Sequence, residues 1–189
     1  MRKVSLLIFF TALCSACLFG PSHTSGVKNF NREQVELKDG TRYRTGALSP
    51  TWQRSSSRAK VASFYHSQLH STIYSDAFCG AQFEDVKPTE LMSQLESGLE
   101  SKTQLKHSTV QVSGREALQS TFLGKLDGAQ VSTQAVVLKR DRCMFDFVLI
   151  SQPSFFVAAQ ADFQKFISGF EMLAPRNSKC RGHWCGAQP

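Results

Sequence analysis

The stretch DRCMFDFVLISQPSFFVAAQADFQKFISGF, residues 141–170, decides the fold of this chain of 189 residues. In its first half, apolar side chains at every second position predict a strand with one buried face: Cys143, Phe145, Phe147 and Leu149. Pro153 ends that strand. From Ser154 the apolar spacing changes to steps of three and four, which predicts a helix with one apolar face: Phe156, Ala159, Phe163, Phe166, Ile167 and Phe170. So much aromatic surface is unfavourable in water, and the helix is therefore expected to lie against the sheet.

The residues upstream predict the rest of that sheet. Three strand-like runs precede it, HSTVQVSG, EALQSTFLGKL and AQVSTQAVVLKR, at residues 107–114, 116–126 and 129–140. Asp127-Gly128 between the last two is a strong hairpin signal, and residues 139–142 form a short charged connection. The four strands should therefore form an antiparallel meander. Alternation in the third run predicts a strand with one buried face, made of Val131, Thr133, Ala135 and Val137.

Residues 27–102 predict a more mixed region. KDGT at residues 38–41 indicates a turn between short strands, and KVASFYH (60–66) and STIYSDAFC (71–79) have the β-branched and aromatic composition of strands. A helix is expected over residues 88–102, because Pro88 suits a first helical turn and an apolar stripe follows it: Leu91, Met92, Leu95 and Leu99. The predicted fold class is α+β, an antiparallel sheet with two amphipathic helices packed on it.

This succession of elements resembles the PsbP-like fold, and the resemblance covers residues 40–173. It is strongest in residues 141–170, where a hydrophobic strand meets a helix that finishes in Gly-Phe. The resemblance implies a small α/β/α sandwich, as in photosystem accessory proteins, a Ran-binding nuclear-transport protein and many bacterial lipoproteins. That family has no shared catalytic residues, so none is carried over. Its members act mostly by binding or by supporting larger assemblies, and fold alone does not transfer the photosystem or Ran functions.

The first residues, MRKVSLLIFFTALCSAC, predict export. Arg2 and Lys3 precede an apolar run at residues 4–12, which is too short to span a bilayer, since spanning needs about 20 residues, and which fits a secretory signal. Ser-Ala-Cys at residues 15–17 resembles the end of the bacterial lipobox, although Cys14 stands where that motif usually has Leu. We expect cleavage before Cys17 and a diacylglyceryl group on its thiol. Ordinary cleavage after residue 16, without lipidation, is the alternative. Leu18, rather than Asp, favours the outer membrane, with the protein facing the periplasm.

These features divide the chain into a signal peptide (1–16), a lipid anchor with a flexible tether (17–35), a globular PsbP-like domain (36–174) and a C-terminal tail (175–189). The chain has 22 Lys and Arg against 15 Asp and Glu; loss of Arg2 and Lys3 with the signal leaves 20 against 15, a net charge of +5. An exported chain meets no genomic DNA, so no nucleic-acid partner is expected. Loose attraction to anionic headgroups or cell-wall polymers is the expected consequence of the charge.

The six cysteines divide into three groups. Cys14 leaves with the signal, and Cys17 is the expected lipidation site, which leaves Cys79, Cys143, Cys180 and Cys185. An even number in an oxidising compartment predicts two disulfides. Of the three possible pairings we favour Cys79–Cys143, between two predicted strands, and Cys180–Cys185, within the tail. A zinc site in KCRGHWC is the alternative, but this motif offers three ligands where a structural zinc has four.

Two histidines and one aspartate are candidate site residues. His66 and His70 have the i, i+4 spacing of metal ligands on a helix, but they lie between predicted strands, so we interpret them as loop or surface histidines. Asp146 is the most notable acid because it lies in the middle of a predicted strand. Alternation with its phenylalanine neighbours is expected to direct it outward, toward water or Arg142.

Aromatic and basic residues give a further candidate. Trp52, Tyr65 and Tyr74, with the arginines near residue 54, would suit either a binding groove or core anchors beside a solvated basic loop. We favour the second interpretation.

The expected function is a non-catalytic, lipid-anchored envelope protein that acts as a binding or accessory module, with no catalytic residue, metal or cofactor. Its partners would be the membrane, through the lipid, and an envelope protein or cell-wall component. A small envelope hydrolase and a secreted, unanchored binding protein are the alternatives. No serine stands in a GxSxG-type elbow, but triads assemble in space rather than in sequence. A cleft that placed His66, His70 or Asp146 beside a serine would favour the hydrolase, and an apolar groove would favour the binding module.

Overall fold

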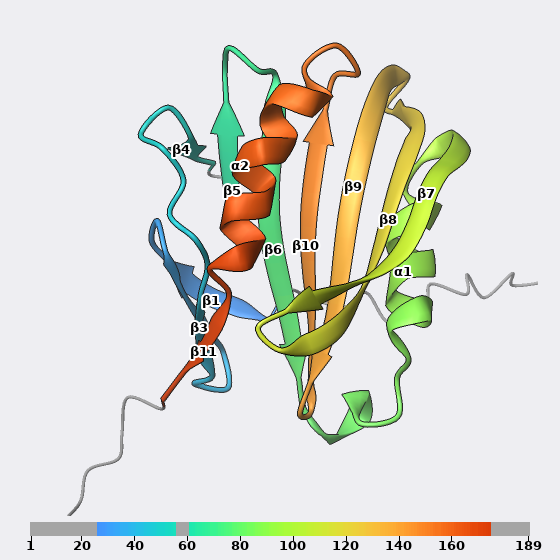
Figure 1. Ribbon diagram of the computed structural model, residues 1–189. Helices are drawn as coiled ribbons and strands as arrows, with labels where there is room; N and C mark the ends of the chain where they lie inside the picture. Colours follow the sequence, from blue (N-terminus) through green and yellow to red (C-terminus); the bar gives the residue numbers. More distant parts are fainter. Residues whose placement is uncertain (1–25, 56–60, 175–189) are drawn as a thin grey trace, which may run out of the picture.

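The computed structural model describes residues 26–55 and 61–174, which form three layers (Figure 1). The middle layer is a seven-stranded antiparallel sheet in the order β4-β5-β6-β10-β9-β8-β7. Its strands are β4 (Gln53–Arg54), β5 (Ala62–His66), β6 (Ser71–Cys79), β7 (Glu100–Val112), β8 (Arg115–Leu126), β9 (Ala129–Arg140) and β10 (Cys143–Ser151). β7 to β10 form the predicted meander, and β10 then pairs with β6. The predicted α+β fold class is confirmed.

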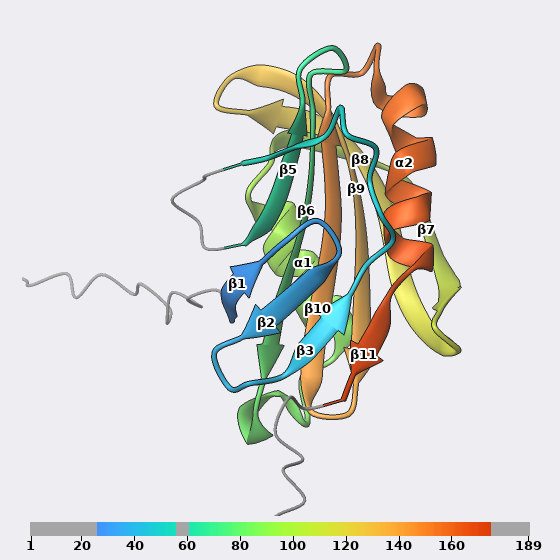
Figure 2. The same ribbon diagram turned by 90° about the vertical axis from the view of Figure 1, so that its left-hand side faces the viewer.

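One face of this sheet is covered by α2 (Phe156–Ser168) and by a small second sheet, as the edge-on view shows (Figure 2). The small sheet has the order β1-β2-β3-β11, with β1 (Val27–Phe30), β2 (Gln34–Leu37), β3 (Arg42–Arg44) and β11 (Glu171–Leu173). Val27 and Val35 are only 2% and 3% exposed. The folded domain therefore begins before residue 36, where we predicted its boundary with the tether. The sequence pattern misses β1 and β2 because strands of four residues bury too few side chains to show a clear periodicity.

The core on this face is built around the aromatic stripe of α2. Phe163 and Phe166 are fully buried, and the ring of Phe166 lies 6.3 Å from that of Phe147 in β10, centroid to centroid. Tyr43 of β3 meets Phe145 of β10 edge-on at 5.3 Å, so the small sheet closes the same core. The predicted packing of this helix against the sheet is confirmed, and it removes most of the aromatic surface from water.

The opposite face carries α1 (Pro88–Ser97), which follows the short 3-10 helix η1 (Ala81–Phe83). Leu91 and Met92 of α1 pack with side chains of β8 and β9, among them Phe122. The helix is shorter than the predicted 88–102. It ends before Gly98, and the backbone from Glu100 onward pairs with β8 as part of β7. Strand pairing therefore overrides the helical spacing of the last turn.

β9 is buried on both faces rather than on the one face that we predicted. Val136 belongs to the core beneath α2, whereas Val137 belongs to the cluster beneath α1. Gln134, which alternates with the residues of the predicted buried face, is also only 1% exposed. The physical reason is that a central strand between two covered faces has no solvent side. The predicted hairpin turn at Asp127-Gly128 is confirmed, since both residues have the positive φ, 49° and 79°, that a tight hairpin requires.

Candidate functional site

Two aspartates lie opposite each other on the central strands. Asp76 of β6 and Asp146 of β10 are register partners, and the backbone N–H of Asp76 donates a hydrogen bond of 3.1 Å to Oδ1 of Asp146. Oδ1 of Asp76 accepts a 2.8 Å hydrogen bond from the backbone N–H of Ala77. The two residues are 6% and 4% exposed. Both carboxyls lie on the face of the sheet that α1 covers. Met144 and Val148, two residues before and after Asp146, lie on the same face of β10 as Asp146 and pack in one cluster with Leu91 and Met92 of α1.

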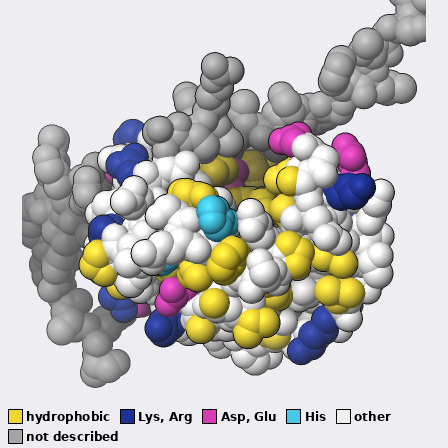
Figure 3. All heavy atoms as spheres, turned by 90° about the horizontal axis from the view of Figure 1, so that it is seen from above, with side chains coloured by type: hydrophobic (Ala, Val, Ile, Leu, Met, Phe, Trp, Pro, Cys, Tyr) yellow, Lys and Arg dark blue, Asp and Glu magenta, His cyan; other side chains and the backbone are white. Residues whose placement is uncertain are grey.

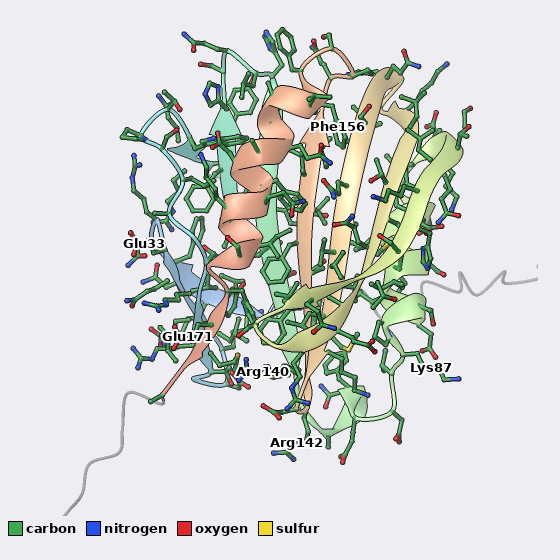
Figure 4. All side chains as sticks on the ribbon, viewed as in Figure 1. Glu33, Lys87, Arg140, Arg142, Phe156 and Glu171 are labelled. Carbon is green, nitrogen blue, oxygen red and sulfur yellow. A yellow bond between two sulfur atoms is a disulfide. The ribbon has the colours of Figure 1, made fainter. Side chains whose placement is uncertain are left out.

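The prediction that Asp146 points toward water or pairs with Arg142 is therefore wrong. The alternation was correct, but the second face of β10 is covered rather than solvated. Arg142 is exposed in the turn between β9 and β10. Its side chain points away from the lower end of the sheet (Figure 4).

Burial and the second carboxyl set the protonation of Asp146. Loss of hydration and, to a lesser extent, the neighbouring Asp76 carboxyl raise the pKa of Asp146, backbone N–H groups oppose the shift, and together they bring it to about 7. Tyr74 lies in the same strand as Asp76, and its pKa is raised by burial and by both carboxyls. At neutral pH Asp146 therefore holds its proton much more readily than an ordinary aspartate does. A cation placed beside it would favour the ionised form.

A pocket of about 400 Å³ lies between α1 and the sheet, with Asp146 in its wall. Six apolar side chains line it, together with three polar ones: Phe78, Phe83, Val86, Leu91, Leu95 and Met144, with Glu90, Gln94 and Asp146. In the view from above, hydrophobic side chains and an acidic group lie in a recess on the side of the sheet that bears α1 (Figure 3). A pocket of this size, apolar with a few polar groups, is typical of a small-molecule site.

The loop that leads from η1 to α1 forms part of the pocket wall, and Lys139 of β9 holds it. The ammonium of Lys139 donates hydrogen bonds to the backbone carbonyl oxygens of Glu84 and Val86, the latter at 3.1 Å. Because these bonds join the loop to the sheet, they position the loop residues that line the pocket.

The predicted histidine candidates do not reach this pocket. His66 is 7% exposed, and its ring meets that of Trp52 edge-on at 5.2 Å. Its Nδ1 accepts a 3.2 Å hydrogen bond from the backbone N–H of Leu69. His66 is therefore not a loop or surface histidine, because β5 extends to it and Trp52 covers it. His70 is exposed, as predicted. Within residues 26–55 and 61–174, no three His, Cys, Asp or Glu side chains lie close enough to hold a metal ion.

The aromatic and basic candidates also separate in space. Trp52 is 1% exposed and its Nε1–H donates to Asp162 at 2.9 Å, so it is the core anchor that we favoured. Tyr65 is 40% exposed. Arg54 lies over the ring of Phe30, 4.0 Å from its centroid. These residues do not line one groove.

The expected disulfide between Cys79 and Cys143 is present, and the two cysteines are register partners across β6 and β10. Each aspartate lies three residues from its cysteine, in opposite directions along antiparallel strands. Because the two cysteines are opposite each other, the two aspartates are also opposite each other. An odd number of residues separates each aspartate from its cysteine, so the aspartates share one face of the sheet and the cysteines the other. Asp76 is not among the predicted site residues, and this shared register is the sequence signal that identifies it.

The remaining predicted features lie outside the residues that the structure describes. They are the signal peptide, the lipidation site Cys17, and the tail with Cys180 and Cys185. Among the helices in the described parts of the chain, none has the length and apolar character needed to cross a membrane.

No protein-family model and no curated protein sequence matches this chain. Solved structures do match it. A cyanobacterial PsbP protein (CyanoP) from Synechocystis sp. PCC 6803 is 9% identical, with a TM-score of 0.51 over 76% of this chain and 95% of that one. LpqN, a protein involved in cell envelope biogenesis of Mycobacterium tuberculosis, is 13% identical, with a TM-score of 0.54 over 75% of this chain and 90% of that one. At these identities the likeness concerns the fold alone. The chain therefore has a PsbP-like α+β fold, two helices packed on antiparallel sheets.

Proposed function

We propose that this chain is a non-catalytic binding module of the cell envelope, held at the membrane by a lipid on Cys17. The pocket between α1 and the sheet is its binding site. The observation that carries the binding role is the pocket itself, about 400 Å³ in volume with six apolar side chains in its wall. The similar fold of LpqN, which is involved in cell envelope biogenesis, supports the envelope role.

The composition of the pocket favours binding over hydrolysis. A hydrolase that uses a serine nucleophile needs a base beside it, and neither serine nor histidine lines this pocket. Ser75, on the strand that carries Asp76, shares a 2.9 Å hydrogen bond with the hydroxyl of Tyr43 in the small sheet. His66 packs against Trp52. These two residues are therefore buried in other parts of the domain and do not line the pocket.

The binding site is tested with N-phenyl-1-naphthylamine, an uncharged probe that fluoresces in apolar surroundings. The protein is the mature chain, residues 17–189, with Cys17→Ser so that no lipid or micelle competes for the probe. We expect saturable binding that Leu95→Trp weakens by about tenfold or more, because the larger ring occupies pocket space. Ser93→Trp, on the exposed side of α1, is the matched control and should bind as the parent does. Equal binding by all three proteins would contradict the assignment of the pocket.

The anchor is tested separately. Intact-mass measurement of the mature chain from its native envelope should show a diacylglyceryl-modified Cys17 at the N-terminus, and Cys17→Ser should release the protein from membranes. An unmodified N-terminus would instead identify an unanchored exported protein and would leave the pocket assignment untouched.

A further inference from the structure

We propose that the pocket selects a basic amphiphile, in which an apolar body fills the space beneath α1 and a protonated amine pairs with Asp146. This inference rests on the proposed binding function, to which it adds the chemical class of the ligand.

The charges around the pocket favour a cation. Asp146 lines it and is 4% exposed, and its register partner Asp76 brings a second carboxyl to the same face. Glu90 is a second acidic residue in the pocket lining itself, and none of the nine lining residues is Lys, Arg or His. Burying a carboxylate costs free energy unless a cation or hydrogen-bond donors compensate it. An incoming ammonium supplies this compensation.

Two lysines in the described part of the chain lie near this pocket, and their ammonium groups are directed elsewhere. The ammonium of Lys139 donates to the carbonyl oxygens of Glu84 and Val86 in the pocket wall. Lys87, which precedes α1, points outward from the molecule (Figure 4). Neither lysine compensates Asp146, and an ammonium on a ligand can do so.

The apolar lining defines the rest of the ligand. Phe78, Phe83 and Leu95 are among the six apolar residues of the wall, and they favour a hydrocarbon body by removing it from water. A carboxylate on that body would be repelled by the acidic groups, and an alcohol would leave Asp146 without a cation. A charge-assisted hydrogen bond from an ammonium is stronger than a neutral one, so the amine decides the selectivity.

Protons compete with the amine for Asp146. Burial and Asp76 raise the pKa of Asp146 to about 7, whereas an alkylamine resembles a lysine side chain and stays protonated well above that value. Among the described residues, Asp76 and Tyr74 of β6 interact electrostatically with Asp146, Glu90 of α1 lines the same pocket, and Lys139 of β9 lies at the pocket wall. Amine affinity should therefore rise as the pH increases from 6 to 8, because ionised Asp146 becomes the dominant form.

The experiment measures displacement of N-phenyl-1-naphthylamine from the same mature chain by three ten-carbon competitors, n-decylamine, 1-decanol and decanoate. At pH 8 we expect n-decylamine to displace the probe at a concentration about tenfold or more below that of 1-decanol, and decanoate to be the weakest. Asp146→Asn should bring n-decylamine to the level of 1-decanol and abolish the rise in affinity between pH 6 and pH 8.

Asp141→Asn is the matched control, because it makes the same chemical change at an exposed residue of the turn between β9 and β10, outside the pocket lining. It should change amine displacement by less than about threefold, since exposed charge pairs contribute little. Equal displacement by n-decylamine and 1-decanol would overturn the ligand class while leaving the binding site intact. An effect of Asp141→Asn as large as that of Asp146→Asn would also overturn it. Failure of the probe itself to bind would instead overturn the proposed function.

Discussion

Replacing Asp146 by Asn should make the free energy of unfolding less sensitive to pH. In the folded protein the pKa of Asp146 is raised from 3.8 to about 7, so the folded state holds this proton more tightly than the unfolded state does. The resulting stabilisation is fully present below about pH 4, near the pKa of an unfolded aspartate, and is lost as the pH rises through 7. Asparagine has no such proton to lose.

The magnitude follows from the size of the shift. Each pKa unit corresponds to about 1.4 kcal/mol, so a shift of roughly three units is worth up to about 4 kcal/mol. The asparagine Oδ1 can still accept the hydrogen bond from the backbone N–H of Asp76. The NH₂ group of the asparagine does not titrate, so its effect on the free energy of unfolding does not vary with pH. The stability of Asp146→Asn minus that of the parent should therefore rise by up to about 4 kcal/mol from pH 4 to pH 8.

Urea unfolding of both proteins, followed by circular dichroism at several pH values, measures this difference. Asp141→Asn is the matched control, since Asp141 is exposed in the turn between β9 and β10, and its difference from the parent should be nearly constant across the same range. A constant difference for Asp146→Asn would refute the argument that burial and Asp76 hold a proton on this carboxyl. The same pH dependence of the stability difference for Asp141→Asn would show that the effect does not arise from Asp146.

Three further predictions concern stability and use urea unfolding. Phe166→Ala should lower the free energy of unfolding by about 3–5 kcal/mol, because Phe166 is fully buried. Val157→Ala, at a residue of the same helix that is 78% exposed, should change it by less than about 0.5 kcal/mol. Similar losses for the two variants would show that α2 does not pack as described. Joint replacement of Cys79 and Cys143 by serine should cost about 4 kcal/mol, since their bond closes a loop with a sequence separation of 64, and an unchanged midpoint would contradict this. Gly46→Ala should cost at least about 2 kcal/mol, because the added Cβ would lie 2.0 Å from a backbone carbonyl oxygen of α2; a neutral effect would contradict that close approach.

Local patterns predicted most of the elements correctly, because they depend on residues close together in the chain. The hairpin at Asp127-Gly128 and the alternation through Phe145 and Phe147 reflect turn chemistry and strand period, and each is complete within a few residues. The errors lie where an element depends on a distant partner. The last predicted turn of α1 became the start of β7 because β8 pairs with it, and the early strands β1 and β2 are held by a core to which they contribute few side chains.

The candidate site shows the same division. Taken alone, the sequence determined that Asp146 shares a strand face with Met144 and Val148, opposite to its phenylalanine neighbours, because the strand period is two. Only the tertiary structure decided that α1 covers this face, that Asp76 lies opposite Asp146, and that apolar residues of three separate segments enclose a pocket beside it. The physical reason is that burial, and with it the raised pKa of Asp146, is a property of what packs on a face, and those covering residues lie far away in the chain.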